Sequence, residues 1–214
     1  MATILIFVRH GESEGNQSNR FNGSINVPLT DRGRKQAQRT AEYLDKYKID
    51  KIYASDLSRA KDTAQIIANR THLQIVYDKD LREINGGDFE GCPYEDLQKL
   101  YPNEYNMWLN DLGNCVCPNG ESTRGLLERF HKKVKAIIME NVDKTILIAT
   151  HATPIRALST VWYNKDITQI RDFDFVKNAS VTVVDYTDVQ HPVVLEYGNA
   201  EHLNELVTEL PSNI

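Results

Sequence analysis

The sequence predicts an α/β protein, a three-layer α/β/α sandwich around a mostly parallel central sheet. Apolar strand patterns alternate along the 214 residues with segments of helical periodicity, and this alternation is typical of parallel sheets. The strand patterns are continuous apolar runs, such as TILIFV at 3–8 and KTILIAT at 144–150, which indicates that helices cover both faces of the sheet. The length suits a single domain, which we place at residues 1–214.

The first part of the chain supplies three predicted strands and two predicted helices. Strands are expected at 3–8, at 51–55 (KIYAS) and at 73–78 (LQIVYD), and helices at 31–47 and 58–70. Thr30 precedes the first of these helices as a suitable N-cap. Apolar residues spaced three and four apart give that helix one apolar face: Ala37, Ala41 and Leu44.

The closing part of the chain continues the alternation and then changes it. A long helix is expected at 123–141, a strand at 144–150 and another helix at 153–163. Pro154 falls in the first turn of that last helix, where a missing N–H is tolerated. The segments 180–187 and 192–198 predict a final antiparallel pair of strands.

Residues 84–121 break the alternation, and we interpret them as a cap-like insertion over one end of the sheet. This stretch contains glycines, prolines and all three cysteines of the chain. Cys115 and Cys117 have no histidine close by and make a poor zinc site, so we expect reduced thiols and no metal. The aromatic residues are expected to form the small core of this insertion, with a substrate-lining role as the alternative: Tyr94, Tyr101, Tyr105 and Trp108.

The composition disfavours several classes of protein. Hydrophobic residues make up 41% and charged residues 26% of the chain, which is typical of a globular protein. The 30 acidic and 25 basic side chains give a net charge of −5, which disfavours a nucleic-acid partner or an anionic membrane surface. No segment approaches the ~20 apolar residues of a membrane helix, and the N-terminal segment lacks the features of a signal peptide. We therefore expect a cytoplasmic protein.

Strongly polar residues follow the ends of four predicted strands. Each of them alone is more often a structural or solvated residue than a catalytic one. The carboxyl ends of parallel strands meet at one edge of a sheet, and ligands bind at that edge in open α/β folds, so we expect these residues to converge. They are Arg9 and His10 after the first strand, Arg59 after the second, Glu83 after the third and His151 after the fourth.

Two histidines, two arginines and one carboxylic acid suit the transfer of a phosphoryl group. Guanidinium groups match phosphate oxygens and hold the charge that develops in the transition state. An imidazole is partly unprotonated near pH 7 and attacks phosphorus without a metal. A protonated carboxyl delivers a proton to the leaving alkoxide. The set therefore predicts metal-independent phosphoryl transfer through a phosphohistidine.

Five blocks of the sequence, in order, resemble the signatures of the histidine phosphatase superfamily, in its phosphoglycerate mutase-like branch with an RHG motif. The blocks are VRHGESEGN (8–16), SDLSRAKDTA (55–64), LREINGGDFEG (81–91), PNGES (118–122) and ATHATPIRAL (149–158). The resemblance covers residues 3 to about 158. It implies the phosphoglycerate mutase-like fold and an enzyme that needs no cofactor and no metal.

The resemblance also implies a role for each matching residue. His10 corresponds to the nucleophile, and Glu83 to the general acid that later activates water. Arg9, Arg59 and His151 correspond to the phosphate pocket, in which His151 favours the charged transition state. Further implied phosphate ligands are Asn16 and the backbone N–H of Ala152, and implied substrate contacts are Ser13, Asn22 and Gly23. The implied partners are a small phosphorylated substrate and inorganic phosphate as product.

Two departures from the family pattern bear on the function. Ala152 stands where relatives usually carry glycine, so we expect a different local turn, with Thr153 and Pro154 adding bulk at the pocket rim. REINGGDFEG replaces the ERHYG segment of phosphoglycerate mutases, and residues 84–121 hold one lysine (Lys99), no arginine and several acids. Because a mutase has to bind a doubly anionic bisphosphate, we expect a phosphatase.

Three alternatives stay open. The first is a phosphoryl transfer of the phosphoglycerate mutase type. The second is a pseudoenzyme that binds phosphorylated partners without turnover, although such a protein would not need an acid such as Glu83. The third is a small-molecule kinase or nucleotide-binding module, for which the sequence lacks a GxxxxGK segment.

Overall fold

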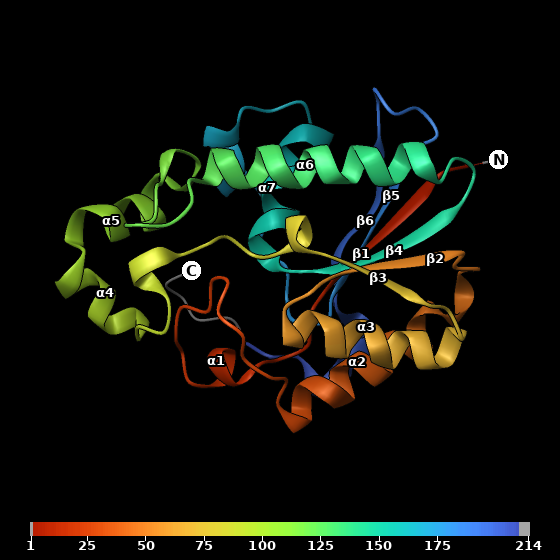
Figure 1. Cartoon of the computed structure of the whole chain (residues 1–214), viewed down its shortest axis with the longest axis horizontal. Helices are drawn as coiled ribbons and strands as arrows, with labels where there is room; N and C mark the ends of the chain where they lie inside the picture. The colour runs from red at the N-terminus through yellow and green to blue at the C-terminus, as the bar shows by residue number, and fades with distance from the viewer. Residues whose placement is uncertain (1, 210–214) are drawn as a thin grey trace.

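The computed structural model describes residues 2–209, and this part of the chain forms a six-stranded sheet in the order β3-β2-β4-β1-β5-β6 (Figure 1). Four neighbouring strands are parallel: β3 (Ile75–Asp78), β2 (Lys51–Ser55), β4 (Thr145–Thr150) and β1 (Ile4–Arg9). β5 (Val181–Asp185) runs antiparallel both to β1 and to the edge strand β6 (Val193–Asn199). The predicted mostly parallel sheet and the antiparallel closing pair are confirmed.

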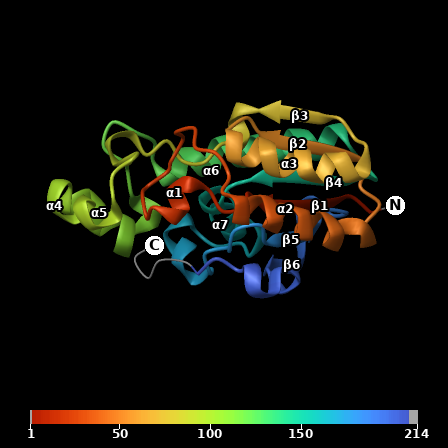
Figure 2. The same cartoon turned by 90° about the horizontal axis from the view of Figure 1, so that it is seen from below.

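Helices cover both faces of the sheet (Figure 1; Figure 2). One layer consists of α2 (Asp31–Tyr43) and α3 (Ser58–Thr71), and the other of α6 (Thr123–Glu140) and α7 (Ala152–Trp162). Side chains of β1 alternate between the two layers, because successive residues of a strand point to opposite faces. Leu5 and Phe7 pack with α6 and α7, whereas Ile6 and Val8 pack with α2 and α3. The three-layer α/β/α sandwich is therefore confirmed.

The predicted strands and helices agree with the structure within two residues, apart from one helix end. The helix predicted at 31–47 ends at Tyr43, and a 3-10 turn, η1 (Leu44–Lys46), follows it. Thr30 caps the start of α2 as predicted, since its Oγ1 accepts a hydrogen bond from the N–H of Gly33 at 3.0 Å. The predicted apolar face of this segment is buried: Ala37, Ala41 and Leu44.

Residues 84–121, called the cap below, extend beyond the carboxyl end of the sheet (Figure 2). The cap contains η3 (Gly87–Phe89), α4 (Tyr94–Leu100), α5 (Pro102–Asn110) and η4 (Leu112–Asn114). Tyr105 and Trp108 are buried in a core that the cap shares with side chains of α6 and α7. Tyr94 packs against this core and also lines the pocket described below. The predicted core role of these aromatic residues is confirmed, and Tyr94 and Trp108 also line the pocket. The three cysteines are free thiols, as expected.

The remaining elements are short. They are α1 (Glu14–Gln17), η2 (Lys79–Leu81), η5 (Ile167–Asp172) and η6 (Glu201–Leu206). The loops around α1 lie next to the cap at the carboxyl end of the sheet (Figure 2). Over residues 2–209, the structure contains no helix that combines the length and the apolar character needed to cross a membrane.

Candidate active site

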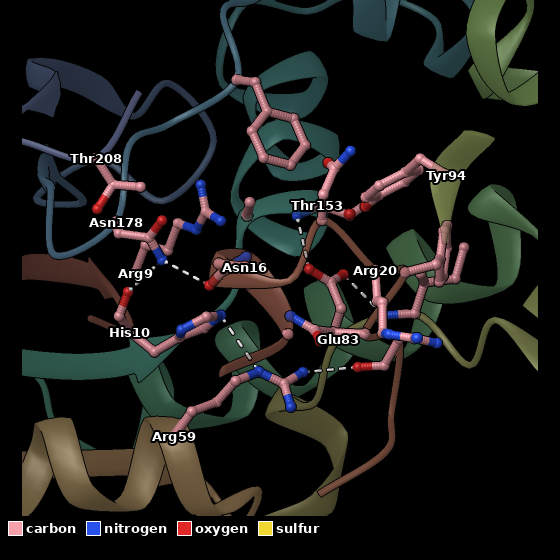
Figure 3. Close-up of a pocket in the computed structure, with 18 of the residues that line it drawn as sticks. Arg9, His10, Asn16, Arg20, Arg59, Glu83, Tyr94, Thr153, Asn178 and Thr208 are labelled. Atoms are coloured by element: carbon pink, nitrogen blue, oxygen red, sulfur yellow. Dashed lines mark hydrogen bonds between the residues drawn. The ribbon is translucent and has the colours of Figure 1, made fainter. Parts of the chain in front are cut away.

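A pocket lies at the carboxyl edge of the parallel strands, between the sheet and the cap (Figure 3). Eight of the residues predicted from the sequence line it: Arg9, His10, Asn16, Asn22, Gly23, Arg59, Glu83 and Ala152. Two further predicted residues, Ser13 and His151, are fully buried and do not belong to the part of the lining that the structure describes. The imidazole of His151 nevertheless lies close to the pocket, with its ring centroid 5.1 Å from that of His10. The predicted convergence at one sheet edge is therefore present.

The imidazole of His10 is neutral, and the backbone selects its tautomer. Its Nδ1 lies 2.7 Å from the carbonyl oxygen of Gly11. Because a carbonyl oxygen only accepts hydrogen bonds, Nδ1 carries a proton, and Nε2 keeps its lone pair because it accepts a hydrogen bond from the Nε–H of Arg59 at 3.3 Å. Burial, followed by the positive charges of Arg59 and Arg9, lowers the pKa of His10 well below its ordinary value. His10 therefore offers an unprotonated nitrogen at the pocket.

Arg59, in the first turn of α3, is fully buried and connects His10 to the loop before α2. Its Nε–H donates to His10 Nε2 at 3.3 Å. Its Nη2 and Nη1 donate to the carbonyl oxygens of Gly23 and Ile25 at 2.6 and 2.8 Å. Gly23 has a φ of +48°, a left-handed conformation that favours glycine. Burial lowers the pKa of Arg59 to about 10, so its guanidinium is charged at neutral pH.

Arg9, the last residue of β1, is a second buried cation. Its Nη1 donates to the carbonyl oxygen of Val176 at 2.6 Å, and its guanidinium carbon lies 5.1 Å from the ring centroid of Phe175. Its Nε–H is buried and has no acceptor among residues 2–209. Burial lowers the pKa of Arg9 to about 10, which still leaves it charged at neutral pH. A charged donor without an acceptor fits an anionic ligand.

Glu83 faces the pocket from the segment that follows β3. Its Oε1 accepts a hydrogen bond from the N–H of Ile84 at 2.8 Å, and its Oε2 accepts one from the N–H of Thr153 at 3.2 Å. Burial raises the pKa of the Glu83 carboxyl, and these backbone hydrogen bonds and the charge of Arg59 oppose the increase. The carboxyl therefore stays protonated to higher pH than an ordinary glutamate does, which suits a proton donor.

His151 and Ala152 stand at the start of α7. His151 is the N-cap, and its Nε2 lies 2.8 Å from the Oγ of Ser55. Its Nδ1 is buried without a hydrogen-bond partner in the described part of the chain, and burial, then the charge of Arg59, lowers its pKa. Ala152 is the first helical residue of α7, so the altered turn that we predicted for alanine is not required here. The positive end of the α7 dipole adjoins the pocket through Ala152 and Thr153.

The side chain of Asn16 is oriented by a network of hydrogen bonds. Its Oδ1 accepts from the N–H and the Oγ of Ser13 at 3.1 and 2.8 Å, and from Asn178 Nδ2 at 3.1 Å. These donors direct the Nδ2 group of Asn16 away from Ser13. The hydroxyl of Ser13 also accepts from Asn22 Nδ2 at 3.2 Å and caps α1. Ser13 thus organises the neighbouring side chains, and the structure does not bring it to the pocket surface.

Several pocket residues were not identified from the sequence: Arg20, Phe175, Asn178 and Thr208. Asn178 donates from Nδ2 to the carbonyl oxygen of His10 at 3.2 Å, although the two residues are 168 positions apart. Thr208 is held at the pocket by Gln36, whose Nε2 donates to its Oγ1 at 2.8 Å. No local sequence pattern marks these residues, because their positions depend on contacts between distant parts of the chain.

The donors of this pocket suit an anion. They are guanidinium groups, asparagine amides and backbone N–H groups at a helix N-terminus, which are the groups that bind phosphate in proteins. Within residues 2–209, no three His, Cys, Asp or Glu side chains are grouped so that they could hold a metal ion. The fold and the site thus define a class: α/β sandwiches with an anion pocket built around a histidine at the carboxyl edge of the sheet.

A comparison with protein-family models makes this class specific. Residues 5–200 match the histidine phosphatase superfamily (branch 1), and the chain belongs to this family. It is 35% identical over 204 residues to phosphoglycerate mutase-like protein 4 of Arabidopsis thaliana, covering 94% of this chain and 87% of the relative. It is 29% identical over 205 residues to phosphoserine phosphatase 1 of Hydrogenobacter thermophilus, covering 96% of each chain. Among solved structures, Bacillus stearothermophilus YhfR is similar with a TM-score of 0.90 at 27% identity, over 94% of this chain and 100% of that one. The family and the fold expected from the sequence are confirmed.

Proposed function

We propose that this protein is a metal-independent phosphatase that hydrolyses phosphate monoesters through a phosphohistidine on His10. The observation that carries the proposal is the hydrogen bond of 2.7 Å between His10 Nδ1 and the carbonyl oxygen of Gly11. It fixes a proton on Nδ1, and together with the hydrogen bond that Nε2 accepts from Arg59 it leaves Nε2 as an unprotonated nucleophile in a pocket that contains two buried arginines. Membership of the histidine phosphatase superfamily supports the proposal, and so does the similarity to a protein named as a phosphoserine phosphatase.

In the first step, the phosphate group of the ester lies among Arg9, Arg59 and the N-terminus of α7. The lone pair of His10 Nε2 forms a bond to phosphorus while the bond between phosphorus and the ester oxygen breaks. The leaving oxygen takes the proton of Glu83, whose raised pKa keeps that proton available. This step yields the phosphohistidine, an ionised Glu83 and the free alcohol.

In the second step, water attacks the phosphorus atom of the phosphohistidine. The Glu83 carboxylate takes a proton from that water, and the bond between phosphorus and Nε2 breaks, which returns the lone pair to His10. The unpartnered Nδ1 of His151 donates a hydrogen bond to a phosphoryl oxygen and stabilises its negative charge, while Ser55 donates to Nε2 of the same ring. Inorganic phosphate then leaves a regenerated site.

The charges of the cap favour hydrolysis over mutase-type transfer. Lys99 is paired with Asp96 at 3.4 Å, and its side chain is 76% exposed, so it does not serve the pocket. Mutase-type transfer remains the second candidate, since one similar protein is named phosphoglycerate mutase-like protein 4. Turnover is favoured over simple phosphate binding by Glu83, because a protein that only binds phosphate has no use for a protonatable carboxyl there.

The experiment that tests the proposal is the release of inorganic phosphate from a panel of phosphate monoesters in the presence of excess EDTA. The panel contains phosphoserine, 3-phosphoglycerate and p-nitrophenyl phosphate. We expect hydrolysis by the wild type, none by His10→Ala, and unchanged activity for His191→Ala, because His191 is exposed and pairs with Asp188. An inactive wild type on every ester, or an active His10→Ala variant, would contradict the proposal.

A further inference from the structure

The pocket contains a third arginine for which the proposed chemistry has no role. Arg20 lies in the loop after α1 and lines the same pocket as His10 and Glu83 (Figure 3). Its Nη1 donates to the carbonyl oxygen of Gly91 at 2.6 Å, which anchors its guanidinium at the edge of the cap. Within residues 2–209, no carboxylate pairs with Arg20. The positive charge of Arg20 is therefore not tied up in an ion pair within the described part of the chain.

The direction in which the ester must lie follows from the proposed first step. An attack by His10 Nε2 expels the ester oxygen on the side of phosphorus opposite to that nitrogen. The expelled oxygen must also lie next to Glu83, which gives it a proton. The alcohol part of the substrate consequently extends from Glu83 away from His10. In Figure 3, Glu83 lies between His10 on one side and Arg20 and Tyr94 on the other.

We propose that the substrate carries a carboxylate on its alcohol part and that Arg20 binds this carboxylate. This inference rests on the proposed phosphatase function. Because Nη1 donates to Gly91, the edge formed by Nε–H and Nη2–H stays available. Two parallel N–H groups on one edge of a guanidinium match the two oxygens of a carboxylate. Arg20 is thus a specificity-determining residue for a phosphorylated hydroxy acid or hydroxyamino acid.

The surroundings of Arg20 favour a carboxylate over a second phosphate. The other pocket residues on the cap side are largely aromatic or apolar: Phe21, Ile84, Tyr94 and Trp108. The two remaining arginines of the described lining are assigned to the transferred phosphate: Arg59 donates to His10 Nε2, and Arg9 precedes His10 at the end of β1. Glu209, which also lines the pocket, adds negative charge. One guanidinium balances one carboxylate, whereas a second phosphate dianion would be left with excess charge.

The test compares two esters that differ only in the carboxylate, namely phosphoserine and phosphoethanolamine. Both carry the same phosphate and the same ammonium group. We expect the wild type to hydrolyse phosphoserine with the higher kcat/KM. Arg20→Gln should lower kcat/KM for phosphoserine about tenfold, the usual scale for a charge-assisted hydrogen bond. The kcat/KM for phosphoethanolamine should stay within about twofold of the wild-type value. Arg20→Lys should give an intermediate loss, since lysine keeps the charge but not the forked donors.

Two controls keep the result interpretable. Arg39→Gln removes an exposed arginine on α2, and it has to leave kcat/KM for both esters unchanged. Calorimetry with the inactive His10→Ala variant measures binding without turnover. In that variant, Arg20→Gln should weaken the binding of phosphoserine and leave the binding of phosphoethanolamine unchanged. Equal losses for both esters, or an unchanged preference, would mean that Arg20 only anchors the cap through Gly91, and this would overturn the inference. A wild type that hydrolyses neither these nor any other ester would instead reject the phosphatase function itself.

Discussion

Replacing Glu83 by glutamine removes the proposed proton donor and changes little else in the pocket. The carboxyl accepts hydrogen bonds from the N–H groups of Ile84 at 2.8 Å and Thr153 at 3.2 Å. The amide oxygen of glutamine retains one of these bonds, and its NH₂ group opposes the other N–H. One lost backbone hydrogen bond costs about 0.5–1.5 kcal/mol of folding stability. Glu83→Gln should therefore fold, and a modest fall in the thermal midpoint is the expected control result.

The loss of activity should depend on the leaving group. An alkoxide needs a proton as it leaves, so kcat/KM for an alkyl phosphate should fall about 10²–10⁴-fold, the usual size of a general-acid effect, or roughly 3–5 kcal/mol. The phenolate that leaves from p-nitrophenyl phosphate is stable without a proton, so the rate at which this ester phosphorylates His10 should fall less. The pH profile should change as well. Because the pKa of Glu83 is raised, its neutral form persists to higher pH, and wild-type activity should fall as the pH rises through that pKa. Glu83→Gln should lack this alkaline limb.

The assay follows the burst of product release in the first turnover, because Glu83 also serves the attack of water in the second step. Rapid mixing with each ester at a series of pH values separates the two steps. Comparing variant and wild type at the same pH cancels the ionisation of the substrate. Equal burst-rate losses for the alkyl and the aryl ester would refute the assignment of Glu83 as the acid. An unaffected burst for both esters would limit Glu83 to the second step.

Three further predictions concern metal, reaction type and the support of Glu83. Activity should survive excess EDTA, and a loss that added divalent metal restores would show that the mechanism is wrong. Given 3-phosphoglycerate, the protein should release inorganic phosphate faster than it interconverts the isomers, which coupled assays of both products measure; rapid isomer exchange without phosphate release would make it a mutase. Arg129→Lys should lower kcat about tenfold and shift the alkaline limb, because Arg129 pairs with Glu121 at 2.8 Å and donates to the carbonyl oxygen of Glu83 at 2.9 Å. Unchanged kcat and pH profile would show that Arg129 does not position Glu83.

The site residues whose convergence could be predicted from the sequence are those that follow parallel strands. Chain direction alone places the carboxyl ends of β1, β2, β3 and β4 at one edge of the sheet, so His10, Arg59, Glu83 and His151 could be expected there without knowledge of the strand order. Ser13 is the counter-example. The family resemblance implied substrate contact for Ser13, but its hydroxyl caps α1 and donates a hydrogen bond to Asn16 Oδ1.

The residues that sequence analysis did not find depend on pairing between distant segments. β5 lies antiparallel to β1, with Val8 opposite Val181, and this register puts the turn before β5 against the proposed nucleophile. Ala179 N–H donates to the carbonyl oxygen of His10 at 3.1 Å, next to the bond from Asn178. Arg20 reaches the pocket because its loop pairs with the cap, where Phe21 N–H donates to the carbonyl oxygen of Cys92 at 3.0 Å. No local periodicity or motif encodes such contacts.

Trapping of the phosphorylated enzyme tests the central claim most directly. The protein is mixed with a phosphate monoester, quenched in base within the first turnover and mapped by peptide mass spectrometry, since phosphohistidine is stable in base and labile in acid. We predict one phosphate per chain on His10, its loss on acid treatment, and no label in His10→Ala. A label on His151, or turnover by the wild type without any labelled histidine, would contradict the account.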